Sequence, residues 1–280
     1  MKFLSYIKRV GRYILKGIPN YTVQVEVKES SPTNHLRNRN VIVTGGSRGL
    51  GFYIAKKCIS EGANVIITGR NESGLQDASK KLGEKCKYIV FDARNINMID
   101  DLLSQAEALF GNQKINALVS NAGVSLHEKD FREVNEEGWD LQLDTNLKGN
   151  YFLVKKYIGY LERQKDTSGN IVVITSERAR RSDDIPYGLT KTATDSFIRC
   201  FASKVIKKGI RINGVAPGVT ASDMTGITKD ENLYSEWMPQ NRFFVPEEVA
   251  EVVNFMLSEN SSCITGEIIA CNHGRHIATW

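Results

Sequence analysis

The sequence predicts a single α/β domain with a doubly wound parallel sheet of about seven strands and helices on both faces. From residue 40 onward, short apolar runs alternate with amphipathic stretches long enough to form helices. The apolar runs are rich in Val and Ile without strict alternation, which is typical of strands buried on both faces. In such a sheet the connections are right-handed, and ligands bind at the carboxyl ends of the strands. The expected strands are residues 40–45, 64–69, 87–92, 115–120, 170–175, 210–216 and 264–270.

The composition is that of an ordinary globular protein. The chain has 280 residues, of which 41% are hydrophobic and 25% are charged, so it can bury a sizeable core. No stretch approaches the roughly 20 uninterrupted apolar residues of a membrane-spanning helix. Residues 1–20 hold five of the 37 basic residues and no acidic residue, and the other 32 basic residues balance the 32 acidic ones. We therefore expect no nucleic-acid partner.

The cysteines and histidines do not suggest a disulfide framework or a metal site. Five cysteines form no CxxC pair, and most lie in apolar segments. We interpret them as buried thiols in a reducing compartment and expect a cytoplasmic protein. His273 and His276 have a spacing seen in metal sites, but no cysteine or carboxylate cluster joins them. We expect no bound metal.

Residues 1–39 lie outside the strand and helix rhythm and are predicted to be an N-terminal extension to the domain at 40–280. Residues 1–16 form a basic amphipathic pattern with apolar residues on one helical face. Such a helix either makes peripheral contact with an anionic membrane or packs on protein, its own chain or a neighbouring subunit. Residues 21–27 alternate like an extra strand, and residues 28–40 read as a linker.

A glycine-rich turn follows the first expected strand and precedes a helix. This order is typical of a Rossmann-type dinucleotide site, because glycine permits the tight turn and lets a pyrophosphate approach backbone N–H groups at the helix start. A plain turn between strand and helix is the alternative. The turn residues expected at the cofactor are Gly45, Ser47, Arg48, Gly49, Leu50 and Gly51.

The second expected strand indicates which nucleotide binds. Enzymes that use NAD usually carry an acidic residue at its end to bind the ribose 2′-hydroxyl. Here Gly69 stands at that point, Arg70 follows, and Arg48 lies in the glycine turn. Two guanidinium groups near one ribose suit a 2′-phosphate, so we expect NADP(H) to be preferred over NAD(H). Glu72 is the one nearby feature that favours NAD.

Further motifs appear in an order that resembles the classical short-chain dehydrogenases/reductases over about residues 38–275. "TGGSRGLG" at 44–51 is similar to the cofactor turn of this family, "SNAG" at 120–123 to its NNAG segment, and "VAPGVTASDM" to its segment after the sixth strand. The closing "ITGEIIACNHG" has NHG where DGG is common. The resemblance adds these expected cofactor contacts: Asp92, Ala93, Asn121, Ala122, Gly123, Tyr187, Lys191, Pro217 and Gly218.

The same resemblance implies that Asn146, Ser176, Tyr187 and Lys191 are the catalytic residues. A tyrosine stands four residues before a lysine three times, at Tyr53, Tyr151 and Tyr187. Only Tyr187 follows a strand that ends in a serine and opens a new helix, so we select that pair. Ser176 stands 11 residues before Tyr187, a shorter spacing than is common in the family, and Thr175 and Ser182 are the weaker alternatives.

These residues together predict an NADP(H)-dependent oxidoreductase that reduces a carbonyl by hydride transfer, with Tyr187 as proton donor. We expect the Lys191 cation to lower the pKa of Tyr187. The overall pattern looks nearest to the 3-oxoacyl-(acyl-carrier-protein) reductase branch. The substrate is expected to be a small-molecule or carrier-linked carbonyl, with a lipid or glycan precursor ketone as another candidate. A non-catalytic cofactor-sensing or scaffold protein is the alternative class.

Two loops bear on the substrate. Residues 220–244 look like a substrate loop, and their aromatic residues either line an apolar lid or serve as packing. Arg178, Arg180 and Arg181 either receive an anionic substrate or form a solvated loop with Asp183 and Asp184 as partners. Family resemblance further implies a homodimer or homotetramer.

Overall fold

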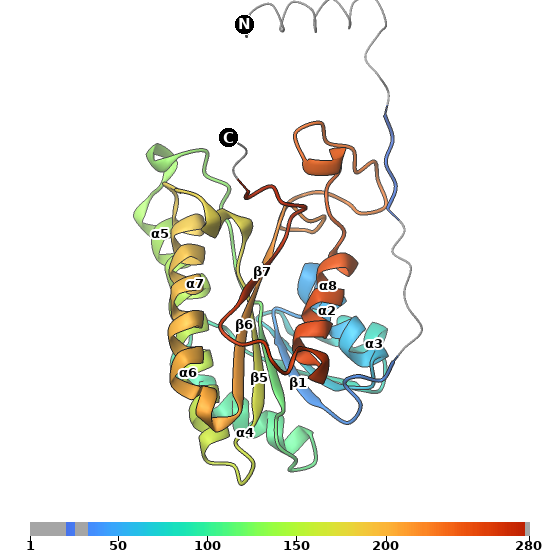
Figure 1. Ribbon diagram of the computed structural model, residues 1–280, viewed down its shortest axis with the longest axis vertical. Coiled ribbons are helices and arrows are strands. Elements are labelled where there is room, and N and C mark those ends of the chain that lie inside the picture. The colour runs from blue at the N-terminus through green and yellow to red at the C-terminus, as the bar shows by residue number, and fades with distance from the viewer. Residues whose placement is uncertain (1–20, 26–32, 278–280) are drawn as a thin grey trace, which may run out of the picture.

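The computed structural model describes residues 21–25 and 33–277. Within these residues, seven parallel strands form one sheet in the order β3-β2-β1-β4-β5-β6-β7 (Figure 1). The chain runs outward from β1 to β3 and then crosses to β4 on the other side of β1. The boundary between β1 and β4 is therefore the switch point, where ligands bind in such sheets. The strands are β1 (Asn40–Thr44), β2 (Asn64–Gly69), β3 (Cys86–Val90), β4 (Ala117–Ser120), β5 (Gly169–Ile174), β6 (Ile210–Pro217) and β7 (Ile268–Cys271).

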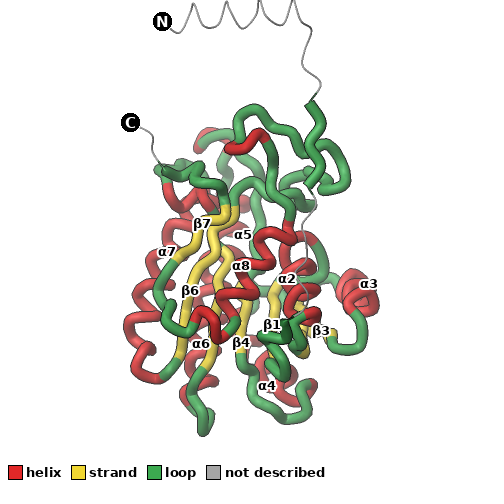
Figure 2. The backbone as a smooth tube through the Cα atoms, turned by 45° about the vertical axis from the view of Figure 1, so that its right-hand side comes forward, coloured by secondary structure: helices red, strands yellow, loops and turns green. Residues whose placement is uncertain are grey.

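Helices cover both faces of this sheet (Figures 1 and 2). Residues of α4, α6 and α7 pack in the core on one face, and residues of α2, α3 and α8 pack in the core on the other. This arrangement confirms the predicted fold class. The helices are α2 (Gly49–Ser60), α3 (Glu72–Leu82), α4 (Ile99–Leu109), α5 (Glu136–Gln142), α6 (Asn150–Glu162), α7 (Pro186–Val205) and α8 (Pro246–Leu257).

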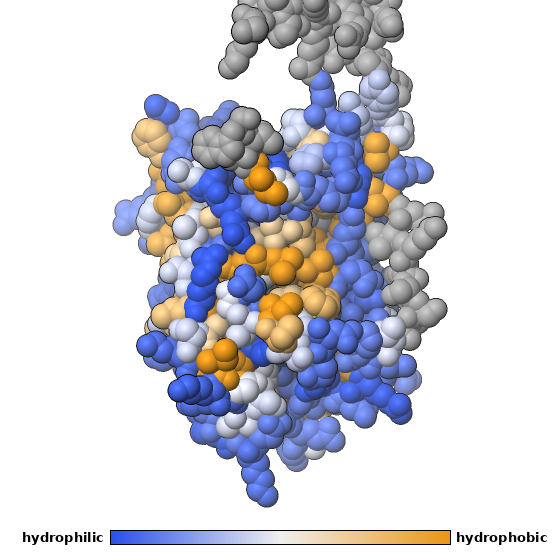
Figure 3. Space-filling model, viewed as in Figure 1, coloured by the Kyte–Doolittle hydropathy of each residue, from blue (hydrophilic) through white to orange (hydrophobic). Residues whose placement is uncertain are grey.

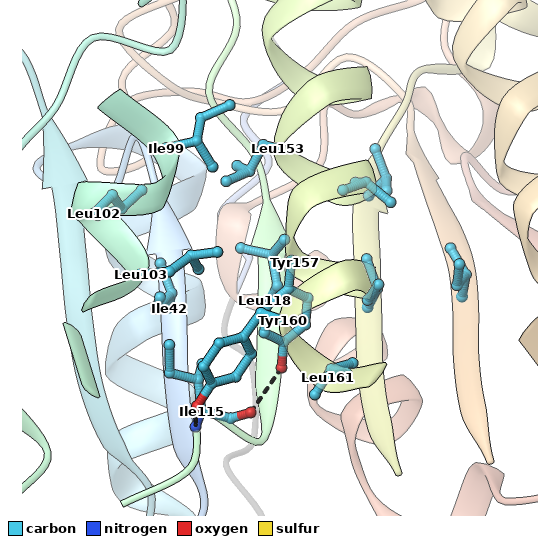
Figure 4. Close-up of a cluster of buried hydrophobic side chains, with 14 of the residues drawn as sticks. Ile42, Ile99, Leu102, Leu103, Ile115, Leu118, Leu153, Tyr157, Tyr160 and Leu161 are labelled. Atoms are coloured by element: carbon cyan, nitrogen blue, oxygen red, sulfur yellow. Dashed lines mark hydrogen bonds between the residues drawn. The ribbon is translucent and has the colours of Figure 1, made fainter. Parts of the chain in front are cut away.

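The two cores explain why the strands are apolar throughout. In β1, Ile42 faces the α4–α6–α7 core, whereas Val41 and Val43 face the opposite core, and all three are fully buried. Tyr157 and Tyr160 lie in the first core with their hydroxyl groups at Ile115 (Figure 4). Tyr157 donates to the Ile115 carbonyl at 2.9 Å, and the Ile115 N–H donates to the Tyr160 hydroxyl at 3.0 Å. These bonds satisfy polar groups that burial would otherwise leave without partners.

The bounds of the first six expected strands agree with the structure within two residues, and two other expected elements differ by more. The last strand begins at Ile268 rather than 264, because Gly266, at φ +78, turns the chain first. The extra strand expected at 21–27 is wrong for residues 21–25, which are not in a strand, while 26 and 27 lie outside the described residues. Val23 accepts one backbone bond, from Leu233, and its own N–H donates to a side chain, so no ladder forms.

Residues 33–39, which the sequence suggested were part of a linker, pack on the end of α2. Leu36 is 1% exposed and belongs to the α2–α3–α8 core. The Leu36 N–H donates to the Glu61 carbonyl at 3.0 Å, and Thr33 binds the Glu61 carboxylate through both its N–H and its hydroxyl. The folded body therefore begins before residue 40.

One edge of the sheet lies at the surface. β7 is the last strand in the order, and its residues 269–271 are half-buried. Hydrophobic residues gather on the face that carries β7 (Figure 3), and Phe255 of α8 is 40% exposed. Exposed strand edges and apolar patches are features that a partner can cover. Among the described residues, no helix has the length and apolar character needed to cross a membrane.

Replacing Leu36 by Ala should destabilise the protein by about 2–4 kcal/mol, because a buried leucine leaves a cavity when it is truncated. Ile206→Ala is the control, since this side chain is 54% exposed, and its effect should stay within about 0.5 kcal/mol. Urea unfolding of the full chain measures both. Equal stabilities for the two variants would show that residues 33–39 contribute nothing to the folded body.

Candidate active site

The glycine turn after β1 lies at the switch point of the sheet. Gly45 and Gly49 have φ of +66 and +53, a conformation that glycine adopts without strain. A Cβ on Gly51 would lie 2.2 Å from the Gly45 carbonyl oxygen, so the turn closes only with glycine there. The helix α2 begins with no side-chain cap at Arg48 and no acidic residue in its first turn. Its first N–H groups are therefore suited to receive an anion.

Two consecutive residues after β4, Asn121 and Ala122, pack against this turn. The N–H groups of Asn121 and Ala122 both donate to the Thr44 hydroxyl, at 2.9 and 3.0 Å. The Asn121 side chain donates to the carbonyls of Thr44 and Gly45, at 2.8 and 3.3 Å. The structure thus brings Asn121 and Ala122 to the glycine turn, whereas a Cβ on Gly123 would lie 3.2 Å from the Asn146 side chain. Sequence reasoning missed Thr44, although its place as the last residue of β1 was a usable signal.

The residues expected at the adenosine end lie around the ends of β2 and β3. A Cβ on Gly69 would be in van der Waals contact with the Leu75 side chain at 3.5 Å and with the Ser47 hydroxyl at 3.7 Å. Arg48 has a 76% exposed side chain, 3.7 Å from the Asp223 carboxylate. A hydrogen bond from Arg94 lowers the pKa of Asp92, and the charge of Arg70 contributes to the same shift. Arg94, which sequence reasoning missed, therefore forms an ion pair with the Asp92 carboxylate at 2.7 Å.

Asn146 lies in a π-helix, Leu143–Gly149, between α5 and α6. Its side chain is fully buried, accepts from the Val124 N–H and donates to the Val124 carbonyl, both at 2.8 Å. Its main-chain carbonyl accepts from the Asn150 side chain at 2.8 Å, and Asn150 in turn accepts from the Ser120 hydroxyl at 2.6 Å. π-Helical turns occur often at functional sites. Sequence reasoning found Asn146 but missed the π-helix and Asn150.

The same π-helix packs against the loop after β3. A Cβ on Gly149 would lie 2.4 Å from the Ala93 carbonyl oxygen. Because Gly149 has no side chain, the π-helix that carries Asn146 can pack directly against the backbone of Ala93. At the other end of the site, the Gly218 N–H donates to the Cys271 carbonyl at 2.9 Å, which holds the Pro217–Gly218 segment on β7.

Tyr187 and Lys191 lie on the first turns of α7, and Lys191 reaches the end of β5. The Lys191 ammonium donates to the Ile174 carbonyl at 2.9 Å and lies 5.6 Å from the centre of the Tyr187 ring. Ser176, the second residue after Ile174, is 8% exposed, accepts from the Arg178 N–H at 3.2 Å and lies close enough to Tyr187 to lower its pKa. Of the two alternatives to Ser176, Thr175 is buried with its N–H bonded to Val215, and Ser182 is exposed.

The other two tyrosine–lysine pairs serve packing. The Tyr53 ring lies under the Lys229 ammonium at 4.7 Å. Tyr151 packs its ring against Phe152, Phe197 and Phe201. Tyr187 is therefore the member of the three pairs that the structure brings to Ser176.

Burial shifts the pKa values of two side chains at this site. It raises the pKa of Tyr187, an effect that exceeds the opposing hydrogen bond with Ser176 and the charge of Arg178. Burial also lowers the pKa of Lys191 to about 8, opposed by the nearby charge of Asp195. The expectation of a lowered tyrosine pKa is thus wrong for the chain alone, because desolvation outweighs the nearby cations. Tyr187 keeps its proton at neutral pH, as a proton donor requires.

The arginine loop after Ser176 is mostly paired within the chain. Arg178 forms a bidentate pair with Asp183, and a Cβ on Gly188 would lie 2.1 Å from that carboxylate. Arg180 donates to the Ile268 carbonyl at 2.7 Å and lies 3.9 Å from Asp195. Arg181 is exposed. The expectation that Asp183 pairs with an arginine of this loop is therefore confirmed. Asp184 instead accepts a hydrogen bond from the Phe131 N–H.

The family model described as Enoyl-(Acyl carrier protein) reductase matches residues 45–276. The chain belongs to the short-chain dehydrogenase/reductase family. It is 36% identical over 248 residues to the 3-oxoacyl-[acyl-carrier-protein] reductase FabG of Chlamydia muridarum, covering 85% of this chain and 98% of the relative. The corresponding protein of Aquifex aeolicus is 32% identical over 247 residues, with 85% and 98% covered.

Two solved structures share the fold. The 3-ketoacyl-(acyl-carrier-protein) reductase of Brucella melitensis complexed with NADH matches with a TM-score of 0.80 and 24% identity, over 86% of this chain and 100% of that one. Levodione reductase matches with a TM-score of 0.79 and 23% identity, over 87% and 99%. The family inferred from the order of the motifs is confirmed, and this short-chain dehydrogenase/reductase is an NAD(P)-dependent oxidoreductase.

Replacing Lys191 by Met should change how stability depends on pH. Because burial lowers the Lys191 pKa from 10.5 to about 8, the unfolded chain binds this proton at a pH where the folded chain does not. The cost of the buried cation is fully present below pH 8 and disappears as the pH rises to 10.5. Across that window, wild type should gain about 3 kcal/mol relative to Lys191→Met.

Urea unfolding at a series of pH values measures this difference. Lys204→Met, which removes an exposed lysine from the same helix, is the matched control. A stability difference between wild type and Lys191→Met that stays constant through the window would contradict the lowered pKa.

Proposed function

We propose that this protein is an NADP(H)-dependent reductase that converts the carbonyl of a 3-oxoacyl thioester into an alcohol. The observation that carries the proposal is the meeting of Ser176, Tyr187 and Lys191 at the end of β5. The similarity to curated reductases of carrier-linked 3-oxoacyl groups supports the substrate class.

The residues around the glycine turn fit a dinucleotide. Glycines whose Cβ atoms would fill the turn, together with the uncapped start of α2, form a cradle for a pyrophosphate. When bound, the nicotinamide supplies or accepts the hydride. The residues that would hold the cofactor are Gly45, Ser47, Arg48, Gly49, Leu50, Gly51, Arg70, Asp92, Ala93, Asn121, Ala122, Gly123, Tyr187, Lys191, Pro217 and Gly218.

The side chains of this chain handle the proton and the developing charge. The Tyr187 hydroxyl donates its proton to the alkoxide that forms at the substrate carbonyl. The Ser176 hydroxyl donates a hydrogen bond to the same oxygen and stabilises its charge. Lys191 stands beside Tyr187 and stabilises the tyrosinate left after proton transfer. By family resemblance, Lys191 also holds the nicotinamide ribose, and Asn146 holds a water that relays protons.

The preference for NADP(H) over NAD(H) rests on charge. Arg48 is largely exposed at the start of α2, and the charge of Arg70 reaches Asp92 at the end of β3. Gly69 supplies no carboxylate that would repel a 2′-phosphate. Guanidinium groups bind phosphate through charge-assisted, often bidentate hydrogen bonds.

We expect a cytoplasmic homodimer or homotetramer, for which the exposed β7 edge and its apolar surroundings offer a surface. The membrane contact predicted for residues 1–16 lies outside the described residues. A sensing protein without turnover is disfavoured because all four catalytic residues are present.

Tyr187→Phe should lower turnover of an acetoacetyl thioester by about 10²–10⁴-fold, the range that general acid catalysis contributes. Loss of NADPH absorbance measures the rate. Tyr53→Phe and Tyr151→Phe remove a hydroxyl from the other two pairs and should retain most of the activity. Full turnover by Tyr187→Phe would remove this tyrosine from the mechanism.

Arg48→Ala and Arg70→Ala should each weaken NADPH binding by about tenfold or more and leave NADH binding nearly unchanged, because each removes a charge-assisted bond to the 2′-phosphate. Isothermal titration of both cofactors measures the two affinities. Lys56→Ala, an exposed residue of α2, is the control. If the ratio of NADPH to NADH affinity stays at the wild-type value in both variants, the charge argument is wrong.

A further inference from the structure

Residues 21–25, called here the N-terminal segment, lie along residues 220–244, the substrate loop (Figure 1). Asn232 joins the two: its side-chain oxygen accepts from the Val23 N–H and its amide donates to the Tyr21 carbonyl, both at 2.9 Å. The Leu233 N–H donates to the Val23 carbonyl at 3.0 Å. Three hydrogen bonds thus attach the N-terminal segment to residues 232 and 233 of the loop, which lie more than 200 positions later in the sequence.

Alternate side chains of the N-terminal segment face the loop. The Tyr21 ring lies 5.2 Å from the Tyr234 ring, centre to centre. Val25 packs against a small apolar cluster formed by Ala221, Leu233 and Val245, each at most 3% exposed. Thr22 and Gln24, between them, are exposed. The segment therefore has one face that binds the loop and one that faces solvent.

The substrate loop continues from this contact to the catalytic serine. The Trp237 ring lies 4.9 Å below the Arg275 guanidinium, and Arg275 pairs with Glu177. Glu177 is 8% exposed, directly follows Ser176 and accepts from the Asn272 side chain at 3.1 Å. An ion pair buried to this degree holds its partners in place, because breaking it leaves a desolvated charge.

The other end of the loop is also fastened at the site. Phe244 is 3% exposed, and its ring lies 2.8 Å from the position of a Cβ on Gly218. The ring also lies 4.6 Å from that of His273, centre to centre. Met238 is buried as well, so these two residues serve as packing, whereas Trp237 is 60% exposed. The middle of the loop is where the N-terminal segment adds its contacts.

We propose that the N-terminal segment is a positioning element for substrate binding: it holds residues 232–234 so that Trp237 stays at the Arg275–Glu177 pair beside Ser176. The effect expected on substrate binding rests on the proposed reductase function, whereas the attachment of the segment does not. It concerns residues outside the 45–276 match to the family model, so it describes a feature that this chain adds to the site. The carbonyl substrate should bind less tightly when the segment is released, because only the fraction of molecules with an ordered loop is competent.

Val25→Asp tests the proposal by placing a charge against the apolar cluster, and Gln24→Asp is the matched control with the same change in net charge at an exposed neighbour. Val25→Ile keeps the apolar contact, and Val25→Ala is a milder variant should Val25→Asp fail to fold. Hydrogen exchange of the Leu233 amide reports attachment without reference to activity. We expect faster exchange at Leu233 in Val25→Asp, and wild-type exchange in Gln24→Asp and Val25→Ile.

Steady-state kinetics supplies the functional readout. For Val25→Asp we expect KM for the thioester to rise about 5- to 10-fold with kcat and the KM for NADPH nearly unchanged, and Val25→Ile to restore wild-type values. Faster exchange without a change in KM would overturn the positioning role. Equal exchange in Val25→Asp and Gln24→Asp would overturn the attachment itself. If no variant and no wild type reduces the thioester, the proposed substrate fails, whereas the exchange result still decides the attachment.

Discussion

The close approach of β1 and β4 at their carboxyl ends is the constraint on which the site depends. Thr44 holds it, because its hydroxyl accepts from two successive N–H groups after β4 while its carbonyl accepts from the Asn121 side chain. The approach leaves no room for a side chain at Gly51 and little at Gly45. The shape of the cofactor turn therefore follows from the packing of two parallel strands on either side of the switch point.

Burial is the largest cause of the pKa shifts of Tyr187 and Lys191 on α7. Tyr187, Lys191 and Asp195 follow one another at helical spacing, so their side chains lie along one face. Burial raises the pKa of the first and lowers that of the second, and the carboxylate of the third opposes the change at the lysine. A protonated tyrosine beside a lysine with a pKa of about 8 is a pair whose charge can change near physiological pH.

The substrate loop lies within residues 45–276, which match the family model, and it binds the N-terminal segment, which lies outside that match. It lies between β6 and α8 in the chain. Its middle contacts the N-terminal segment on one side and, through Trp237, the Arg275–Glu177 pair on the other. A chain of direct contacts therefore runs from Tyr21 through the loop and Arg275 to Glu177, the residue next to Ser176.

The sequence by itself determined the parallel sheet, the glycine turn and the choice of Tyr187. These depend on local patterns: apolar runs such as 40–45, backbone conformations that glycine favours, and the order of motifs along the chain. Only the tertiary structure decided the burial of Leu36, the π-helix around Asn146, the pairing of Arg178 with Asp183 and the raised pKa of Tyr187. It also decided that Val23 binds Asn232 rather than joining a sheet. Burial, and the choice between partners, depend on residues distant in sequence, so local patterns cannot fix them.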